Sequence, residues 1–509
     1  MNNRPPTYPT LTSSYPDNVA LLDSILRVDA SFDLIKKPLK VGQDEMTLYY
    51  VDGFVKDTVM MKLMMSFLAL DGLAQKATSG TADGGRSAGI VGSAGDTGKD
   101  HLLPALEFCA RALPYVETDV TDSTDTAVGM VLAGAALLVG SPFGRGVVVI
   151  DARTYPARDT SEPEGDKVMR GARDGFVETL IFNTALIRRR VRDPALTVSY
   201  TSVGSSSRTD IAIVYMEGKA EADLVERVKS KLAGVQTDAL AMGHESLAEV
   251  LIKKRWYNPF PKIRYTERPD TAAAQLLEGS VLVICDTSPQ VMILPTSIFD
   301  FMQETNDFYF PPLTGTYIRI VRHAVFWLTL FLTPTWYLLI RHPEFLPPWL
   351  AFIIPTEVGR IPIIAQLFLV EFMIDGLRMA SLNTPSMLSN SLSVVGGLIL
   401  GDFAVQIGWL IPEVILYMAF VAIANFTQRS YELGYAFKFM RMGLLLLTAL
   451  GGYWGYGIGV AGIVLLLFTN VTVTGKRHYL YPLIPFDGKA LKSLFFRVRK
   501  DAGGRDRGA

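Results

Sequence analysis

Charged residues are concentrated in the first 315 residues of the chain, whereas residues 320–473 consist mainly of Leu, Ile, Phe, Val, Gly and Ala. In the first part, short apolar runs bounded by turn residues predict strands, and apolar residues three and four positions apart predict helices. In the second part, several apolar stretches are long enough to cross a membrane. The pattern predicts two small α/β domains in a cytoplasmic N-terminal region, followed by a polytopic α-helical transmembrane domain.

The first α/β domain is predicted over residues 28–155, after an N-terminal extension of residues 1–27. Two strands flank a turn at residues 42–44, and two more strand-like runs are GMVLAGAALLVG and GRGVVVIDART. Helices are expected in KDTVMMKLMMSFLAL and HLLPALEFCARAL. In the first of these helices, Met60, Met61, Met64 and Met65 recur at helical spacing, which is typical of core packing or of a partner contact.

Residues 71–100 lack any apolar periodicity and are predicted to be a flexible insertion in this domain. The Gly98-Lys99 pair is found in phosphate-binding loops, but two neighbouring positions exclude that interpretation. Ser93 stands where such a loop requires Gly, and Asp100 stands where it requires Ser or Thr.

A linking helix is predicted within residues 156–195. Its last turn contains Arg188, Arg189 and Arg190, and Asp193-Pro194 follows as a stop signal. Basic residues at this position stabilise a helix through its dipole. The alternative is contact with anionic lipid or with a partner subunit.

The second α/β domain is predicted over residues 196–312, with the strands TVSYTSV, TDIAIVYMEG, SVLVICD and QVMILP. Between them, the stretch YTERPDTAAAQLLEGS predicts a helix that begins near Pro269 and Asp270 and ends at Gly279. Its Glu267, Arg268 and Asp270 are charged, but no His or Cys accompanies them and no metal-ligand spacing occurs in the motif. We therefore expect no enzymatic activity, no metal and no cofactor.

The helical membrane domain is predicted over residues 313–475, with a basic cytoplasmic tail over residues 476–509. Candidate spans lie at 320–340, 361–380, 388–410 and 413–426, and residues 442–471 form either one long span or two short ones joined at residues 451–455. The N-terminal stretch has no apolar segment of the kind found in secretory signal peptides, and the C-terminal tail is rich in Lys and Arg. Both termini are therefore expected in the cytoplasm, with four or six crossings.

Three groups of residues within these spans are candidates for function. Glu371, Asp375 and Arg378 share one helix face, where Asp375 and Arg378 could pair; they form either a functional path or a structural ion pair. A second stripe consists of Ser386, Ser389, Ser393, Gly397, Leu400 and Ala404, with Asp402 beside it. This stripe is either a close-packing seam or the lining of a pore that an apolar ring at Leu400 closes. Gly451, Gly455 and Gly459 indicate helix packing.

Composition narrows the class of protein further. The chain is 49% hydrophobic, and its mean hydropathy of +0.25 is high for a soluble protein of this length. A net charge of −1 provides no basic surface for nucleic acid. The two cysteines, Cys109 and Cys285, fit a reducing compartment and exclude a disulfide framework or a Cys-based zinc site.

Several long motifs, in order along the chain, resemble those of the A-type subunits of the GerA family of spore germination proteins. They are VMRGARDGFVETLIFNTALIRRRVRDP, YNPFPKIRYTERPDTAAAQLLEGSVLVICDTSPQVMILP and SYELGYAFKFMRM. The blocks LRMASLNTP, PEVILYMAFVAIANF and YPLIPFDGKALK look closer to the stage V sporulation protein AF branch than to the nutrient-receptor subunits. The insertion at 71–100 and the block VVGGLILG depart from that branch.

The resemblance implies a multi-pass protein of the inner membrane of the endospore that acts during germination. It implies a homo-oligomeric ion channel, as a pentamer with a cytoplasmic ring of N-terminal domains, in contact with membrane lipid and with other germination membrane proteins. Residues 265–270 would then couple the ring to the membrane, and the Arg triplet at 188–190 is a second candidate for coupling. The alternatives are a transporter or accessory for dipicolinate or other small anions, with the acidic residues at 371–375 acting in coupling, and a non-conducting scaffold.

Overall fold

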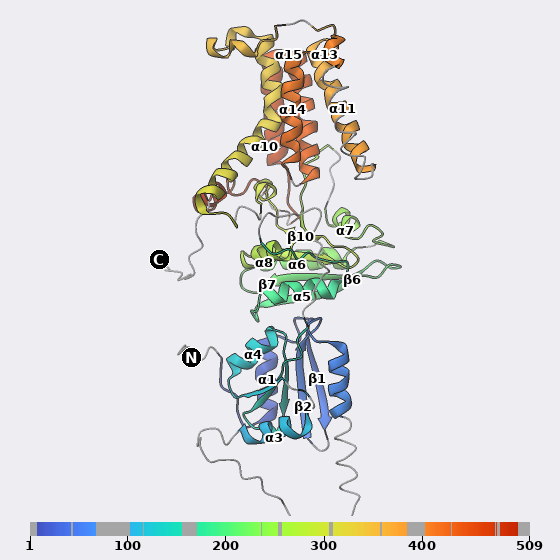
Figure 1. Cartoon of the computed structure of the whole chain (residues 1–509), viewed down its shortest axis with the longest axis vertical. Helices are drawn as coiled ribbons and strands as arrows, with labels where there is room; N and C mark the ends of the chain where they lie inside the picture. Colours follow the sequence, from blue (N-terminus) through green and yellow to red (C-terminus); the bar gives the residue numbers. More distant parts are fainter. Residues whose placement is uncertain are drawn as a thin grey trace, which may run out of the picture. The chain divides into compact units, whose positions relative to one another are not determined.

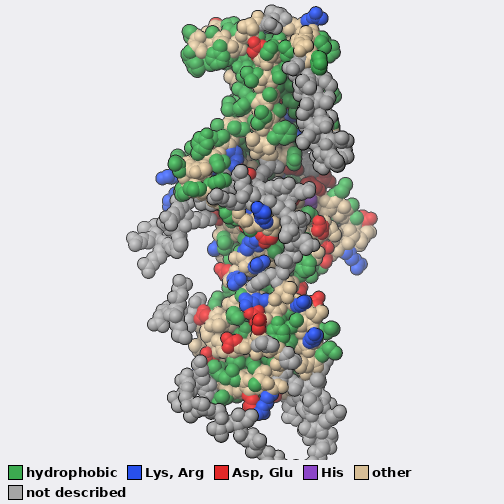
Figure 2. All heavy atoms as spheres, in the orientation of Figure 1, with side chains coloured by type: hydrophobic (Ala, Val, Ile, Leu, Met, Phe, Trp, Pro, Cys, Tyr) green, Lys and Arg blue, Asp and Glu red, His purple; other side chains and the backbone are tan. Residues whose placement is uncertain are grey.

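The computed structural model describes residues 8–41, 44–67, 102–113, 115, 117–154, 171–235, 237–252, 257–304, 309–356, 359–383, 403–428, 430–473, 475 and 479–496 (Figure 1). The chain forms two compact units. The N-terminal unit comprises residues 1–167, 172–251 and 265–294, and the helical unit comprises residues 168–171, 252–264 and 295–509. In the face drawn in Figure 2, Lys, Arg, Asp and Glu side chains are frequent over the N-terminal unit, and hydrophobic side chains dominate the surface of the helical unit.

The first α/β domain has a five-stranded sheet in the order β1-β2-β4-β5-β3. Its strands are β1 (Leu34–Val41), β2 (Asp44–Val51), β3 (Thr118–Thr121), β4 (Ala136–Gly140) and β5 (Val147–Ile150), and neighbouring strands pair antiparallel. One face packs on α1 (Tyr15–Leu26) and α4 (Thr124–Leu132). The other face packs on helical residues 57–67 and on α3 (Leu103–Ala112). The short 3-10 helix η2 (Ser141–Phe143) connects β4 to β5. The sheet is therefore apolar on both faces, as its continuous apolar strands predict.

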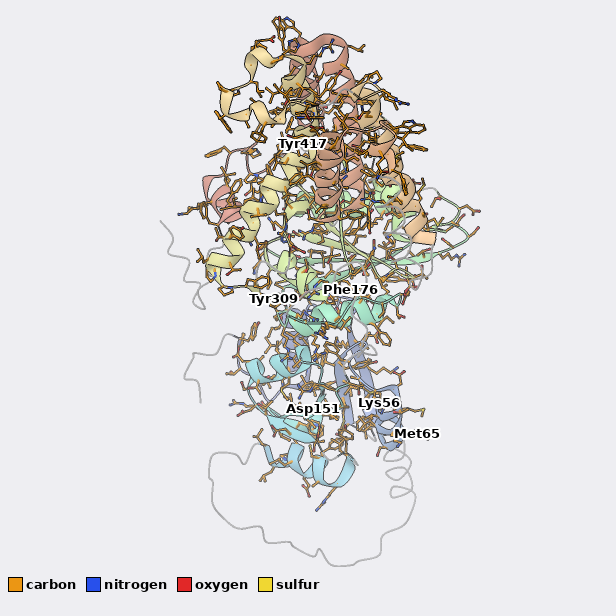
Figure 3. The ribbon with its side chains drawn as sticks, turned by 45° about the horizontal axis from the view of Figure 1, so that its top comes forward. Lys56, Met65, Asp151, Phe176, Tyr309 and Tyr417 are labelled. Carbon is orange, nitrogen blue, oxygen red and sulfur yellow. The ribbon has the colours of Figure 1, made fainter. Side chains whose placement is uncertain are left out.

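The methionines at 60–65 divide between core and surface. Met60 and Met64 pack against the first domain's core, whereas Met61 and Met65 are exposed (Met65 is labelled in Figure 3). Core packing thus accounts for one pair only.

The boundaries of this domain differ from the sequence prediction in two places. Residues 129–132, predicted as part of a strand, form the end of α4, and the strand begins only at Ala136. The prediction was wrong because the apolar run hides the turn at Gly134, whose positive φ of 102° separates helix from strand. In the segment predicted as an extension, α1 inserts the fully buried Leu22 and Leu26 into the core.

The second α/β domain repeats this plan with the strand order β6-β7-β9-β10-β8. The strands are β6 (Leu196–Val203), β7 (Thr209–Met216), β8 (Arg264–Thr266), β9 (Val281–Cys285) and β10 (Val291–Leu294). Helices α5 (Leu180–Arg190) and α8 (Pro269–Leu277) form one core with β6, β7, β9 and β10, and α6 (Ala222–Ala233) and α7 (His244–Leu251) complete the domain. The sequence prediction is confirmed at α8, which begins at Pro269 and ends before Gly279, whose φ is +100°.

The helical unit contains η3 (Ile298–Met302), α10 (Pro312–Arg341), η4 (Pro343–Phe345), η5 (Pro348–Ile353), α11 (Ile363–Asn383), α13 (Ala404–Gln406), α14 (Pro412–Phe426), α15 (Tyr431–Phe468) and α16 (Gly488–Phe495). Among the described residues, α10 and α15 are long and apolar enough to cross a membrane, and α14 is a shorter apolar helix. These helices carry many exposed large apolar side chains, including Leu416, Ile423, Leu450 and Leu465. Such a surface requires lipid or further protein to cover it.

The helix α15 is folded into a hairpin. Gly452 has non-helical dihedrals, φ 55° and ψ −132°, in the middle of its 38 residues. A Cβ added to Gly459 would lie 2.5 Å from Leu444 Cδ1. In a straight helix these residues, fifteen positions apart, would be separated by about 22 Å. The two halves are therefore antiparallel, so residues 442–471 do not form one continuous straight helix.

Candidate functional site

A cluster of four charged side chains lies between α11 and the first half of α15 in the helical unit. Arg441 donates to Glu371 Oε1 from Nε, at 2.7 Å, and also from Nη2. Lys438 forms an ion pair with Asp375, and its Nζ lies 3.6 Å from Glu371 Oε2. The cluster contains two carboxylates and two cations, so its formal charge is zero.

The cluster also connects to the backbone of a third helix. Arg441 Nη1 donates to the carbonyl oxygen of Thr329 in α10 at 2.8 Å, and Lys438 Nζ donates to the carbonyl oxygen of Glu371 at 3.2 Å. Glu371, Lys438 and Arg441 are buried, whereas the Asp375 side chain retains 29% exposure. Because isolated charges are unfavourable in an apolar environment, this pairing fixes α10, α11 and α15 to one another.

The sequence identified the two acidic residues of the cluster but not the two basic ones. Asp375, for which the sequence offered Arg378 as a possible partner, forms an ion pair with Lys438. The Arg378 guanidinium instead lies over three aromatic rings, 5.3 Å from the centroid of Phe426, 5.9 Å from that of Tyr431 and 5.4 Å from that of Tyr435. The signal that could have located the basic residues is their spacing: Lys438 and Arg441 are three positions apart in a largely apolar helix.

The predicted pore stripe is not part of this geometry. Ser386, Ser389, Ser393, Gly397, Leu400 and Asp402 lie outside the described residues. Ala404, at the end of the stripe, is buried at the start of α13.

The tip of the α15 hairpin is held by the end of α10. Arg341 Nη1 donates to the carbonyl oxygens of Thr448, at 3.3 Å, and Ala449. These carbonyls belong to the last turn before the break at Gly452, where a helix leaves acceptors without intrahelical donors. A cation there also complements the helix dipole.

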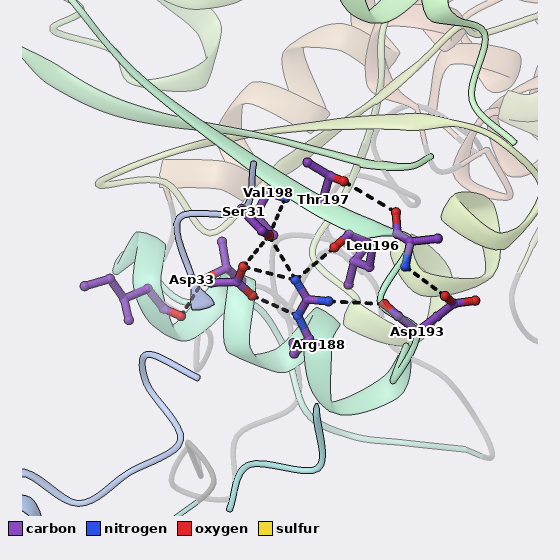
Figure 4. A network of polar contacts seen from close by, with 10 residues as sticks. Ser31, Asp33, Arg188, Asp193, Leu196, Thr197 and Val198 are labelled. Atoms are coloured by element: carbon purple, nitrogen blue, oxygen red, sulfur yellow. Dashed lines mark hydrogen bonds and ion pairs between the residues drawn. The ribbon is translucent and has the colours of Figure 1, made fainter. Parts of the chain in front are cut away.

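In the N-terminal unit, Arg188 forms a buried network between the two α/β domains (Figure 4). Its Nε donates to Asp33 Oδ2 at 2.8 Å, and its Nη2 donates to Asp33 Oδ1 at 3.0 Å and to the Leu196 carbonyl at 3.0 Å. Ser31 Oγ donates to Asp33 and accepts from the backbone N–H of Val198 at 3.0 Å. Both Arg188 and Asp33 are fully buried, with side-chain exposures of 0% and 1%.

The three arginines of the predicted basic turn therefore have different environments. Arg188 belongs to the buried network between the two α/β domains. Arg189 is exposed, and Arg190 forms an ion pair with Asp174 at 2.5 Å. A common role for the triplet in lipid binding does not fit the buried position of Arg188.

The charged residues of YTERPD make local contacts in the second domain. The fully buried Arg268 donates to both carboxylate oxygens of Asp270, at 3.0 and 2.7 Å, and to the Ala172 carbonyl at 2.8 Å. Glu267 accepts from Gln290 Nε2 at 3.0 Å, and its carbonyl accepts from the N–H of Phe176, which is labelled in Figure 3. These contacts hold the start of α8 against the irregular segment preceding α5.

Neither cysteine has the properties of a reactive thiolate. Cys285 is buried in β9, and burial raises the pKa of its thiol to about 12. Burial also raises the pKa of the half-buried Cys109.

The Arg188 network predicts a large difference between two adjacent residues. Arg188→Ala leaves Asp33 as a buried, unpaired carboxylate, which should lower the free energy of unfolding by about 3–5 kcal/mol. Arg189→Ala changes an exposed side chain and should alter it by less than about 0.5 kcal/mol. Denaturant unfolding of the purified chain measures both; equal effects would contradict the structural role of the network.

The fold and site define a membrane-associated protein with an N-terminal region of two α/β domains and a helical unit organised by buried charges. The family model described as "Bacillus/Clostridium GerA spore germination protein" matches residues 21–504, and the chain belongs to this family. The family resemblance found in the sequence is thereby confirmed. Proteins of this family act in spore germination and sporulation and are membrane-associated.

Individual relatives agree with this assignment. The chain is similar to Stage V sporulation protein AF of Bacillus subtilis (strain 168), with 37% identity covering 92% of this chain and 90% of that protein. Spore germination protein KA of the same organism is 26% identical, covering 96% and 85%. Among solved structures, the N-terminal domain of the A subunit of the Bacillus megaterium spore germinant receptor GerK3 is 19% identical with a TM-score of 0.38, covering 56% of this chain and 96% of that chain.

Proposed function

We propose that the chain is the subunit of a homo-oligomeric ion channel that releases ions across the inner membrane of the endospore during germination. The observation that supports this most is the charged cluster of Glu371, Asp375, Lys438 and Arg441 among apolar helices. Ionisable residues within membrane helices face protein or water and often mark ion pathways. The Asp375 side chain retains 29% exposure while its partners are buried. In the proposed channel, its carboxylate is therefore the member of the cluster that faces a water-filled path.

In the proposed channel, subunits of a pentamer place the segment after α11 around a central axis. Ser386, Ser389 and Ser393 line the wet part of the pore, and Gly397 permits close packing below them. Leu400 forms the apolar constriction, and Asp402 lies near its mouth. The N-terminal domains form a cytoplasmic ring, residues 265–270 couple that ring to the membrane, and both termini are cytoplasmic.

The balance of charge in the cluster gives no anion-binding site to the alternative, a transporter or accessory for dipicolinate or other small anions. An anion site needs uncompensated positive charge or free donors. Lys438 and Arg441 are both paired with carboxylates, so the cluster offers no cationic surplus. A non-conducting scaffold for other germination proteins would give no ion flux at all.

Substitutions at the proposed constriction test the pore directly. Leu400→Ser should wet an apolar gate and make the protein constitutively leaky, because dewetting depends on radius and surface polarity. Leu398→Ser, two positions away, should affect packing and leave flux near the wild-type level. Ion-flux assays in liposomes compare the two; background flux for Leu400→Ser, with a response from another helix, would place the pore elsewhere.

A second substitution addresses ion selectivity. Asp402→Asn removes a charge and little volume, so it should lower the preference for cations over anions without abolishing assembly. Reversal potentials under an ion gradient measure the preference. An unchanged potential would remove Asp402 from the conduction path.

A further inference from the structure

The last helix of the helical unit within the described residues is the short α16, Gly488–Phe495, which docks on the first half of α10. Arg319 Nη1 donates to the Ser493 carbonyl at 2.7 Å, and the ring of Phe495 lies 4.8 Å from that of His323. Leu494 is buried in the same core, with Leu491 packed against it. One side of α16 is therefore fixed to the helices of this unit.

The side of α16 that faces away from this core is basic. Lys489 and Lys492 are both exposed. The acidic residue of the segment, Asp487, is occupied as the helix N-cap and accepts from the backbone N–H groups of Lys489 and Ala490 at 2.9 and 3.1 Å. It also accepts from the Tyr481 hydroxyl at 2.9 Å, which closes the loop that precedes the helix.

That loop, together with the residue after the helix, exposes large apolar side chains. Phe486 is 75% exposed, and Leu483, Ile484 and Phe496 are also exposed. Residues 481–496 thus expose both large apolar side chains and two lysines on the surface of the chain. This combination is typical of segments that lie in the interface of a membrane, with the apolar side chains at the acyl boundary and the basic side chains at the headgroups.

We propose that residues 481–496 form an interfacial element that binds the surface of an anionic lipid leaflet. Phe486, Leu483 and Ile484 enter the boundary between headgroups and acyl chains. Lys489 and Lys492 contact the lipid phosphates, where each basic residue strengthens the attraction about five-fold. The choice of an anionic surface follows from charge: the two lysines are exposed, whereas the carboxylate of Asp487 is used within the segment.

The proposed lipid contact of residues 481–496 does not depend on ion conduction. It can therefore be tested by measuring the depth of the segment in the membrane. Phe486→Cys, in the full chain with Cys109→Ser and Cys285→Ala, carries an environment-sensitive fluorophore in nanodiscs of phosphatidylcholine with increasing phosphatidylglycerol. We expect a blue-shifted emission and quenching by brominated lipid, both growing with the phosphatidylglycerol fraction. A label at Lys37→Cys, an exposed position on β1, should remain water-like throughout.

Charge variants separate lipid recognition from simple burial. In Lys489→Gln/Lys492→Gln, the phosphatidylglycerol fraction needed for half-maximal quenching should rise, because each lysine removed weakens the attraction about five-fold. Lys489→Arg/Lys492→Arg should retain the original dependence. Equal quenching in both lipids and in all variants would overturn anionic recognition, and a water-like label at 486 in every nanodisc would overturn the interfacial position.

A second copy of the chain is the competing occupant of this surface. In lipid-free detergent, the emission of the label at 486 should be the same at every protein concentration. If its emission is instead blue-shifted and the shift increases with the fraction of oligomer, the segment is a subunit contact and the proposal fails. Co-purification supports or opposes it independently: the unlabelled wild-type chain should retain phosphatidylglycerol at low salt and lose it at high salt, and the Lys489→Gln/Lys492→Gln variant should retain less.

Discussion

The Arg441→Ala variant should lose about 3–5 kcal/mol of unfolding free energy, because the buried Glu371 carboxylate loses both hydrogen bonds to its Oε1 and keeps only Lys438, 3.6 Å from its Oε2. It also removes the donor to the Thr329 carbonyl, so the contact between α10, α11 and α15 weakens at one point. Thermal unfolding of the detergent-solubilised chain, followed by size-exclusion chromatography, should show a lowered midpoint and a reduced folded yield.

The matched control removes both charges together. Glu371→Leu/Arg441→Met replaces the buried pair by apolar side chains of similar length, which is often neutral for stability. Most of the loss seen in Arg441→Ala should therefore be recovered, and the double-mutant cycle should give a strong favourable coupling. If the double variant is as unstable as Arg441→Ala, orphaned charge is not the cause.

Replacing Gly455 by Ala should destabilise the helical unit by at least about 1–3 kcal/mol, the usual effect of overpacking a close contact. A Cβ at this position would lie 1.9 Å from the Leu447 carbonyl oxygen, so the two halves of the α15 hairpin would have to separate. The contacted atom belongs to the backbone of Leu447, which cannot move aside as easily as the end of a flexible side chain.

Two other glycines of the same helix provide controls. A Cβ at Gly457 or Gly462 meets nothing within 4 Å. Gly457→Ala and Gly462→Ala should therefore be neutral or stabilise by about 0.5–1 kcal/mol, through the better helix propensity of Ala. The same thermal unfolding assay compares all three variants; an equal response at 455, 457 and 462 would show that the hairpin is not closely packed at Gly455.

The sequence was most informative where local chemistry fixes an element. Pro269 and Gly279 bracket α8 because Pro suits the first helical turn and Gly the positive φ that follows the helix. It was ambiguous at α15, because the apolar pattern continues through the break at Gly452. The backbone conformation of that glycine and the close approach of Gly459 to Leu444 distinguish a hairpin from a long helix.

The ion-pair partners could not be predicted from the sequence, because they join residues that are far apart along the chain. Arg188 has a plausible local role at the end of α5, but its partner Asp33 is 155 positions away. Likewise, Arg441 meets Glu371 across 70 positions. Helical spacing brought Glu371, Asp375 and Arg378 to attention, yet it carries no information about which side chains of another helix face them.

Single-channel recording on the purified chain in planar bilayers tests the proposed conduction most directly. The proposal predicts unitary currents from the wild-type chain, with a higher open probability in Leu400→Ser and an altered reversal potential in Asp402→Asn. Neither a scaffold nor a slow transporter produces unitary currents. A correctly assembled, lipid-embedded oligomer without unitary currents, in both the wild type and Leu400→Ser, would contradict ion conduction by this chain.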